Sequence, residues 1–163
     1  MFSTMISRSA RPSSIRRTAI GLENRRTPIV RFYSSQSSTP AITRLLTDDP
    51  RMSKVVVHGG IVYISGQTDA TADDIVGQTR NTLQKVDDLL EAAGTSKKNL
   101  LTASIWLKDI ASDFQGMNGV WNEWLDPDNK PVRATVEAAL AREVLLVEVQ
   151  VTAAIGEKLG RNG

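Results

Sequence analysis

The feature that most constrains the fold is the order in which the spacing of apolar residues changes along the chain. From residue 42 onward, the spacing alternates between the two-residue period of strands and the 3.6-residue period of helices. The predicted order is strand, strand, helix, strand, helix, strand, strand, with a short additional strand around residues 43–46. Two helices cover only one face of such a sheet, so the other face meets solvent or a second subunit. We therefore predict an α+β domain that favours closed oligomers.

The first two strands are predicted as a hairpin within the segment KVVVHGGIVYIS. His58-Gly59-Gly60 separates two β-branched runs, and adjacent glycines permit the positive φ angles of a tight turn. We interpret His58 as a turn residue rather than a catalytic one. Helical spacing follows over residues 71–93, where Thr71 and Asp74 are placed like a capping pair.

A second strand and helix pair is predicted in the middle of the chain. Strand alternation over residues 100–109 precedes a helix that begins near Ser112. An aromatic stripe on this helix is predicted to pack on the sheet rather than to bind a ligand. The stripe consists of Phe114, Met117, Trp121 and Trp124.

Arg133 and Glu148 stand out because each is a long charged side chain among apolar and small residues. They lie in the last two predicted strands, PVRATVEAAL and LLVEVQVTAAI. If these strands form an antiparallel hairpin whose polar faces coincide, Arg133 and Glu148 lie opposite or diagonal to each other. A surface ion pair worth under about 1 kcal/mol explains the same pattern without any site. The pattern alone leaves both interpretations open.

The absence of cysteine and the single histidine narrow the chemistry. Disulfides, thiolate catalysis and sulfur-ligated metals are excluded. A metal site would need carboxylates almost alone, so we expect no structural metal, and we expect no cofactor. No apolar run approaches the roughly 20 residues of a transmembrane helix, so no membrane span is expected. At 163 residues, the chain supports one globular domain.

Residues 1–38 differ in composition from the rest of the chain. They contain seven Arg, nine Ser and a single acidic residue, which is typical of a mitochondrial transit peptide. The sequence RFYS resembles a mitochondrial processing site, so we expect cleavage near Ser34 and a location in the mitochondrial matrix. A basic arm that binds nucleic acid or anionic lipid is the alternative. The predicted division is a transit peptide (1–33), a flexible lead-in (34–41), one domain (42–157) and a C-terminal tail (158–163).

The remaining residues have the opposite charge balance. From residue 39 onward there are 17 acidic and 13 basic side chains. Nonspecific nucleic-acid binding depends on Lys and Arg that neutralise phosphates, so this net acidic domain is not predicted to bind nucleic acid.

Several motifs in order resemble the Rid (YjgF/RidA, reactive intermediate deaminase) family. They are ISGQT (64–68), the long segment from Gln78 to Phe114 that contains LLEAAG and ends soon after LKD, Met117-Asn118, and PVRATVE (131–137) with Glu148 fifteen residues after Arg133. The Trp-x-x-Trp before the arginine is similar to a branch of small bacterial paralogues. The resemblance implies a chorismate-mutase-like (bacillus type) fold with a mixed sheet, two helices on one face, and a homotrimer with ligand clefts between subunits.

The resemblance also implies an activity and its residues. Members hydrolyse 2-enamino and 2-imino acids, such as 2-aminoacrylate, to 2-keto acids and ammonia. Arg133 matches the arginine that binds the substrate carboxylate, and Glu148 matches the acid that positions water and transfers a proton. Ser65 with Gly66, Asn118 and Thr135 match further positions of the cleft. A locally satisfied hydroxyl at the end of a strand is the alternative for Ser65.

Two residues depart from the family pattern and leave the substrate range open. Met52 stands where RidA-like members have tyrosine, and Thr135 stands where they often have cysteine. A trimer that binds a carboxylate metabolite without turnover, or that regulates a partner, is therefore the alternative function. Chorismate mutase activity would need several cationic contacts for a dicarboxylate, and the sequence offers one good candidate.

Overall fold

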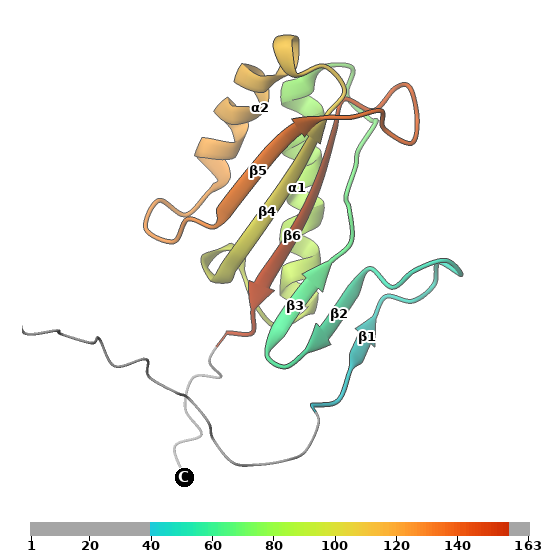
Figure 1. The fold of residues 1–163 in the computed structure, drawn as a ribbon, viewed down its shortest axis with the longest axis vertical. Coiled ribbons are helices and arrows are strands. Elements are labelled where there is room, and N and C mark those ends of the chain that lie inside the picture. The colour runs from blue at the N-terminus through green and yellow to red at the C-terminus, as the bar shows by residue number, and fades with distance from the viewer. Residues whose placement is uncertain (1–39, 157–163) are drawn as a thin grey trace, which may run out of the picture. The chain divides into compact units, whose positions relative to one another are not determined.

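The computed structural model describes residues 40–156. The predicted transit peptide (1–33) and C-terminal tail (158–163) lie outside the described residues, as does most of the predicted lead-in. Within the described residues, six strands form one mixed sheet in the order β1-β2-β3-β6-β4-β5 (Figure 1). The strands are β1 Thr43–Leu45, β2 Val55–His58, β3 Ile61–Ile64, β4 Leu100–Leu107, β5 Val132–Glu137 and β6 Val147–Ala154.

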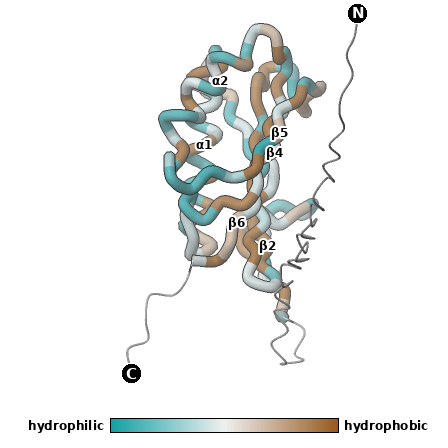
Figure 2. Tube along the Cα trace, turned by 60° about the vertical axis from the view of Figure 1, so that its left-hand side comes forward, coloured by the Kyte–Doolittle hydropathy of each residue, from teal (hydrophilic) through white to brown (hydrophobic). Residues whose placement is uncertain are grey.

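Two α-helices, α1 (Ile75–Ala92) and α2 (Ile110–Trp124), form a second layer on one face of the sheet (Figure 2). A short 3-10 helix, Lys97–Asn99, precedes β4. The core between the layers combines alternate residues of the central strands with one stripe of each helix, as the predicted periodicities require. The predicted α+β fold with both helices on one face is confirmed. Neither α-helix of the described residues is both long and apolar enough to cross a membrane.

The helix starts differ from the sequence prediction because carboxylates cap both helices. Asp74 is the N-cap of α1 and accepts a hydrogen bond from Gly77 N at 2.8 Å. The predicted capping pair is therefore half right, since Thr71 binds Asp69 instead. Asp109 caps α2, which begins at Ile110 rather than near Ser112. Phe114 is 39% exposed, so it does not join the core as predicted.

The hairpin of β2 and β3 is confirmed. Gly59 and Gly60 both have positive φ angles, 58° and 80°, which favour the tight turn that the sequence predicts. The side chain of His58 is half-buried at this turn.

The predicted hairpin of the last two strands is wrong. β4 lies between them, pairing in parallel with β5 and antiparallel with β6. The reason is the connection through α2, because a helix that links two strands carries the chain back and lets the second strand pair in parallel with the first. β5 therefore occupies one edge of β4 and leaves the other edge to β6.

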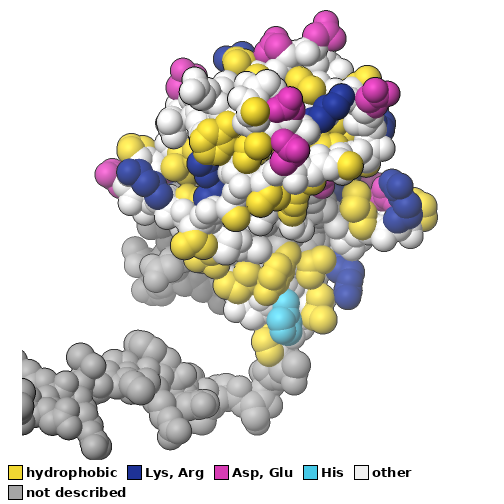
Figure 3. Space-filling view, turned by 45° about the horizontal axis from the view of Figure 1, so that its top comes forward, with side chains coloured by type: hydrophobic (Ala, Val, Ile, Leu, Met, Phe, Trp, Pro, Cys, Tyr) yellow, Lys and Arg dark blue, Asp and Glu magenta, His cyan; other side chains and the backbone are white. Residues whose placement is uncertain are grey.

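The face of the sheet opposite the helices exposes several apolar residues beside polar ones such as Thr102 and Gln150. Tyr63, Val132 and Val136 lie on this face and are 46%, 71% and 48% exposed. Hydrophobic side chains gather over the lower part of the face seen in Figure 3, with few charged side chains among them. This open face is the uncovered sheet surface that the element order predicts.

Candidate functional site

Arg133 lies on β5, the edge strand, and its side chain is on the helix side of the sheet. It pairs in register with Ala103, a buried residue of the core face, and paired residues project to the same side. Its guanidinium carbon lies 5.2 Å from the centroid of the Trp121 ring. Partial burial lowers the pKa of Arg133 from its ordinary value, and among the described residues no carboxylate pairs with it. The guanidinium therefore keeps its hydrogen-bond donors for a ligand.

Two of the other predicted residues share a strand or helix face with Arg133 or with the tryptophan that it contacts. Thr135 is two residues further along β5 on the same face, and its buried hydroxyl has no hydrogen-bond partner among the described residues. Asn118 lies one turn before Trp121 on α2, so both are on the same side of the helix. We call Arg133, Thr135, Asn118 and Trp121 the arginine cluster. Arg133 also lines a shallow hollow of about 260 Å³ between β4 and β5.

Glu148 lies on β6 and projects to the open face, beside Ser65 and Gly66 in the segment that follows β3. It pairs in register with Trp106. A Cβ atom added to Gly66 would lie 1.9 Å from the Glu148 carboxylate, so glycine is required for the carboxylate to occupy this place. The Gln67 side chain donates to the Ser65 hydroxyl at 2.9 Å, which leaves the Ser65 proton available. We call Glu148, Ser65, Gly66 and Gln67 the glutamate cluster.

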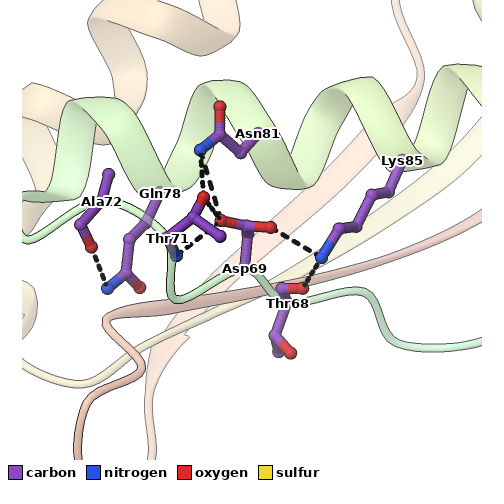
Figure 4. Close-up of polar contacts among 7 residues, drawn as sticks. All are labelled: Thr68, Asp69, Thr71, Ala72, Gln78, Asn81 and Lys85. Carbon is purple, nitrogen blue, oxygen red and sulfur yellow. Dashed lines mark hydrogen bonds and ion pairs between the residues drawn. The ribbon is translucent and has the colours of Figure 1, made fainter.

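The glutamate cluster is held in place by backbone and side-chain contacts. Gln67 and Val149 exchange two backbone hydrogen bonds of 2.8 and 3.0 Å, which attach the segment to β6. Asp69 then anchors the segment to α1 through an ion pair of 2.7 Å with Lys85 and a hydrogen bond from Asn81 (Figure 4). Thr71 donates to Asp69 from its backbone nitrogen and from its hydroxyl. Together these contacts hold the pKa of Asp69 well below its usual range, chiefly through Lys85 and Thr71.

The two clusters do not meet within one chain. Arg133 is on the helix side of the sheet, Glu148 is on the open face, and β4 separates their strands. The predicted placement of Arg133 opposite or diagonal to Glu148 in one chain is therefore wrong. Alternate residues share one face within each strand, as expected. The face of β5 that carries Arg133 and the face of β6 that carries Glu148 nevertheless point in opposite directions.

A further hollow of about 340 Å³ shares no residue with either cluster. Its polar lining includes Gln78, whose amide donates to Ala72 O and Val144 O and accepts from Leu146 N. Because all of these bonds fasten loops to α1, we assign Gln78 a structural role. Among the described residues, no group of three His, Cys, Asp or Glu side chains is arranged to hold a metal ion.

Sequence reasoning missed three residues that shape the clusters. Trp121 was interpreted as core alone, although it also contacts Arg133. Asp69 and Gln67 were not singled out from the sequence. The Asp-x-Thr pattern at residues 69–71 is typical of a turn and is a signal that could have indicated Asp69. Met52, which replaces the family tyrosine, is 45% exposed in the turn between β1 and β2.

Comparison with known protein sequences gives a consistent result. Residues 47–155 match the family described as Endoribonuclease L-PSP. A RutC family protein of Haemophilus ducreyi is 38% identical over 109 residues, which cover 66% of this chain and 92% of that protein. The RutC family protein YoaB of Escherichia coli is 37% identical, covering 66% of this chain and 93% of that protein. A mitochondrial protein of Schizosaccharomyces pombe, mmf2, is 35% identical, covering 63% of this chain and 83% of mmf2.

Solved structures agree with the sequence comparison. A YjgF family protein from Neisseria meningitidis superposes with a TM-score of 0.69 at 34% identity, covering 72% of this chain and 97% of that chain. A YjgF/YER057c/UK114 family protein from Mycobacterium tuberculosis gives a TM-score of 0.63 at 27% identity, covering 70% of this chain and 99% of that chain. With more than half of its residues matched to the family and the same fold in these relatives, the chain belongs to the YjgF/Rid family.

Proposed function

We propose that the protein hydrolyses short 2-imino and 2-enamino acids to 2-keto acids and ammonia. The observation that carries this proposal is the state of Arg133, which lies on an edge strand against an aromatic ring and has no carboxylate partner among the described residues. A partly desolvated guanidinium with free donors suits a carboxylate, which it binds through two parallel hydrogen bonds. The family to which the chain belongs supports the same chemistry.

We further propose that each active site forms between two subunits of a homotrimer. Arg133 and Glu148 project to opposite faces of one sheet, so a site that contains both requires Arg133 from one subunit and Glu148 from its neighbour. The exposed apolar residues of the open face, including Val132 and Val136, supply surface that a subunit contact would bury. Light scattering should give the mass of a trimer, and a monomer would contradict this arrangement.

The reaction needs little from the protein beyond placement and proton transfer. Arg133 fixes the substrate carboxylate, and the Glu148 carboxylate accepts a proton from water as the oxygen bonds to the imine carbon. Glu148 then returns this proton to the amino nitrogen of the resulting amino alcohol, the carbon–nitrogen bond breaks to release ammonia, and the hydroxyl loses its proton to solvent as the carbonyl of the keto acid forms. The species that water attacks is the protonated imine, which an enamine becomes by gaining a proton at carbon. Ser65, Asn118 and Thr135 supply donors and acceptors that orient the substrate.

The backbone of β5 offers further donors at this site. Ala138 N donates to Leu107 O on β4, so alternate residues along β5 point their backbone groups in that direction. Arg133 and Thr135 therefore direct their N–H groups away from β4, toward the open edge of the sheet. These amides are suitably placed to bind the same anion as the guanidinium.

The deciding experiment measures ammonia from 2-aminoacrylate or 2-iminobutyrate generated in place by a dehydratase. Arg133→Ala should lower the hydrolysis rate by at least about 100-fold, because the carboxylate loses its anchor. Arg80→Ala is the matched control, since Arg80 is exposed on α1 and belongs to neither cluster. Equal rates with and without the wild-type protein would contradict the deaminase proposal.

The alternative is a protein that binds a carboxylate metabolite without turnover. The replacement of the family tyrosine by Met52 is the observation that favours it, because the change removes a phenol that could hydrogen-bond the ligand. Such a protein would be stabilised thermally by a 2-keto acid yet release no ammonia.

Incubation of the same preparation with a synthetic RNA tests the endoribonuclease activity named in the family description. We do not expect this activity from a net acidic domain.

We also propose that the protein acts in the mitochondrial matrix. The composition of residues 1–38 and the mitochondrial relative mmf2 support this location. Fusion of residues 1–38 to a fluorescent protein should direct the fusion to mitochondria. Replacement of the seven arginines in that segment by glutamine should abolish the targeting, and a cytosolic signal from the unmodified fusion would contradict the proposal.

A further inference from the structure

Trp121 contacts the one residue on which the proposed function chiefly depends. Its ring is 3% exposed and packs in the core, but one face lies 5.2 Å from the guanidinium carbon of Arg133. A guanidinium stacks on an aromatic face without using its N–H donors, because the contact is made through the π-system. A carboxylate partner would orient the arginine equally well but would compete with the substrate for the same donors.

Trp121 is itself fixed by a chain of contacts that reaches α1. The rings of Trp121 and Trp124 are 5.2 Å apart and tilted by 52°. The indole nitrogen of Trp124 donates to Asp87 at 2.8 Å, and Lys97 contacts both the Asp87 carboxylate and the Trp124 ring. The tryptophan pair is thus attached to both helices, so it offers Arg133 a rigid surface.

We propose that Trp121 is a positioning residue that holds the Arg133 guanidinium ready for the carboxylate of a short 2-imino acid. This inference rests on the proposed function, and it adds a residue that acts through Arg133 rather than on the substrate. The ring limits the rotation of the arginine side chain and shields one face of it from water. The substrate carboxylate then binds to the free N–H donors of a guanidinium that is already ordered, so less conformational entropy is lost on binding.

The first test measures binding of 2-oxobutyrate, a stable 2-keto acid, together with turnover. Trp121→Leu should weaken binding and raise KM by about 3- to 30-fold, with a smaller fall in kcat. Trp121→Phe keeps an aromatic face and should recover most of the loss. Val120→Ala is the matched control because Val120 is a buried neighbour of Trp121 on α2. The affinity of this variant for 2-oxobutyrate should stay within about two-fold of wild type. Equal affinities in Trp121→Leu and Val120→Ala would overturn the inference.

The second test follows Arg133 directly and does not depend on turnover. In the NMR spectrum, the Arg133 side-chain N–H signal is assigned by its absence in Arg133→Lys. In the wild type the signal should be shifted by the ring current and should show an ordered side chain, and both properties should vanish in Trp121→Leu. If the protein proves inactive but this change is seen, the deaminase proposal fails and the positioning role stands. An unchanged Arg133 signal in Trp121→Leu overturns the positioning role whatever the activity.

Discussion

The arginine cluster and the glutamate cluster are positioned by different kinds of interaction. Gly66 and its neighbours are held by a backbone bridge to β6 and by the ion pair of Asp69 with Lys85. Arg133 is held by packing against Trp121 at the edge of the sheet. The first arrangement uses directional bonds to fix the backbone segment that lies beside the Glu148 carboxylate, whereas the second orients a cation and leaves its hydrogen-bond donors unused.

This difference matches the two chemical tasks that we propose. A group that transfers a proton must be placed closely relative to water, and directional bonds provide that placement. A group that captures an anion from solution must not already be satisfied, and an aromatic contact meets that need. We therefore expect a steric change beside Glu148 to lower the rate of hydrolysis. Loss of the ion pair of Asp69 should instead lower the free energy of unfolding.

The largest expected effect concerns the assignment of the two clusters to different subunits. Arg133→Ala and Glu148→Gln should each be nearly inactive alone. Mixed trimers from co-expression should regain activity, since about one quarter of the clefts would combine a native arginine with a native glutamate by random assortment. Ammonia release from the purified mixed trimer measures the recovery. Absence of any recovery in confirmed mixed trimers would contradict the two-subunit cleft.

A smaller but still large effect is expected from Gly66→Ala. The added Cβ would overlap the Glu148 carboxylate, so the side chain must move, and the rate should fall by about 10- to 100-fold. Gly119→Ala is the control, because a Cβ at Gly119 meets no atom within 4 Å and should slightly stabilise α2. Normal turnover in Gly66→Ala would show that the position of Glu148 is unimportant.

Asp69→Asn tests the anchor of the glutamate cluster through stability. At neutral pH the variant should be less stable by about 1–3 kcal/mol in urea denaturation, since charge-assisted hydrogen bonds are lost. The pKa of Asp69 is lowered in the folded state, so its contribution is present above the unfolded pKa and is lost as pH falls through the folded value. The two proteins should therefore converge only in strong acid. Asp73→Asn, an exposed neighbour, should behave like wild type throughout.

The smallest effect is expected from Thr135→Val in the arginine cluster. The buried hydroxyl lacks a partner among the described residues, so its removal should change the stability of the free protein by less than about 1 kcal/mol. If the hydroxyl binds substrate, KM should rise a few-fold while kcat changes little. A large loss of stability would instead show that Thr135 has a structural partner.

Much of the architecture follows from local sequence patterns. The hairpin at Gly59-Gly60 was predictable because its turn needs positive φ angles that glycine provides. The two helices and their shared face follow from 3.6-residue periodicity, which tertiary contacts rarely reverse in long amphipathic segments. The resemblance carried by PVRATVE identified Arg133 and Glu148 as candidates before any geometry was known.

The sequence by itself determined the elements, their hydrophobic faces and the residues of interest. Only the tertiary structure decided that β4 separates β5 from β6 and that Arg133 and Glu148 project to opposite faces. The alternation of side chains is a local property of each strand, whereas the pairing of strands depends on how α2 carries the chain across the sheet. The contact of Trp121 with Arg133 arises in the same way, because it joins two elements whose relative position no local pattern specifies.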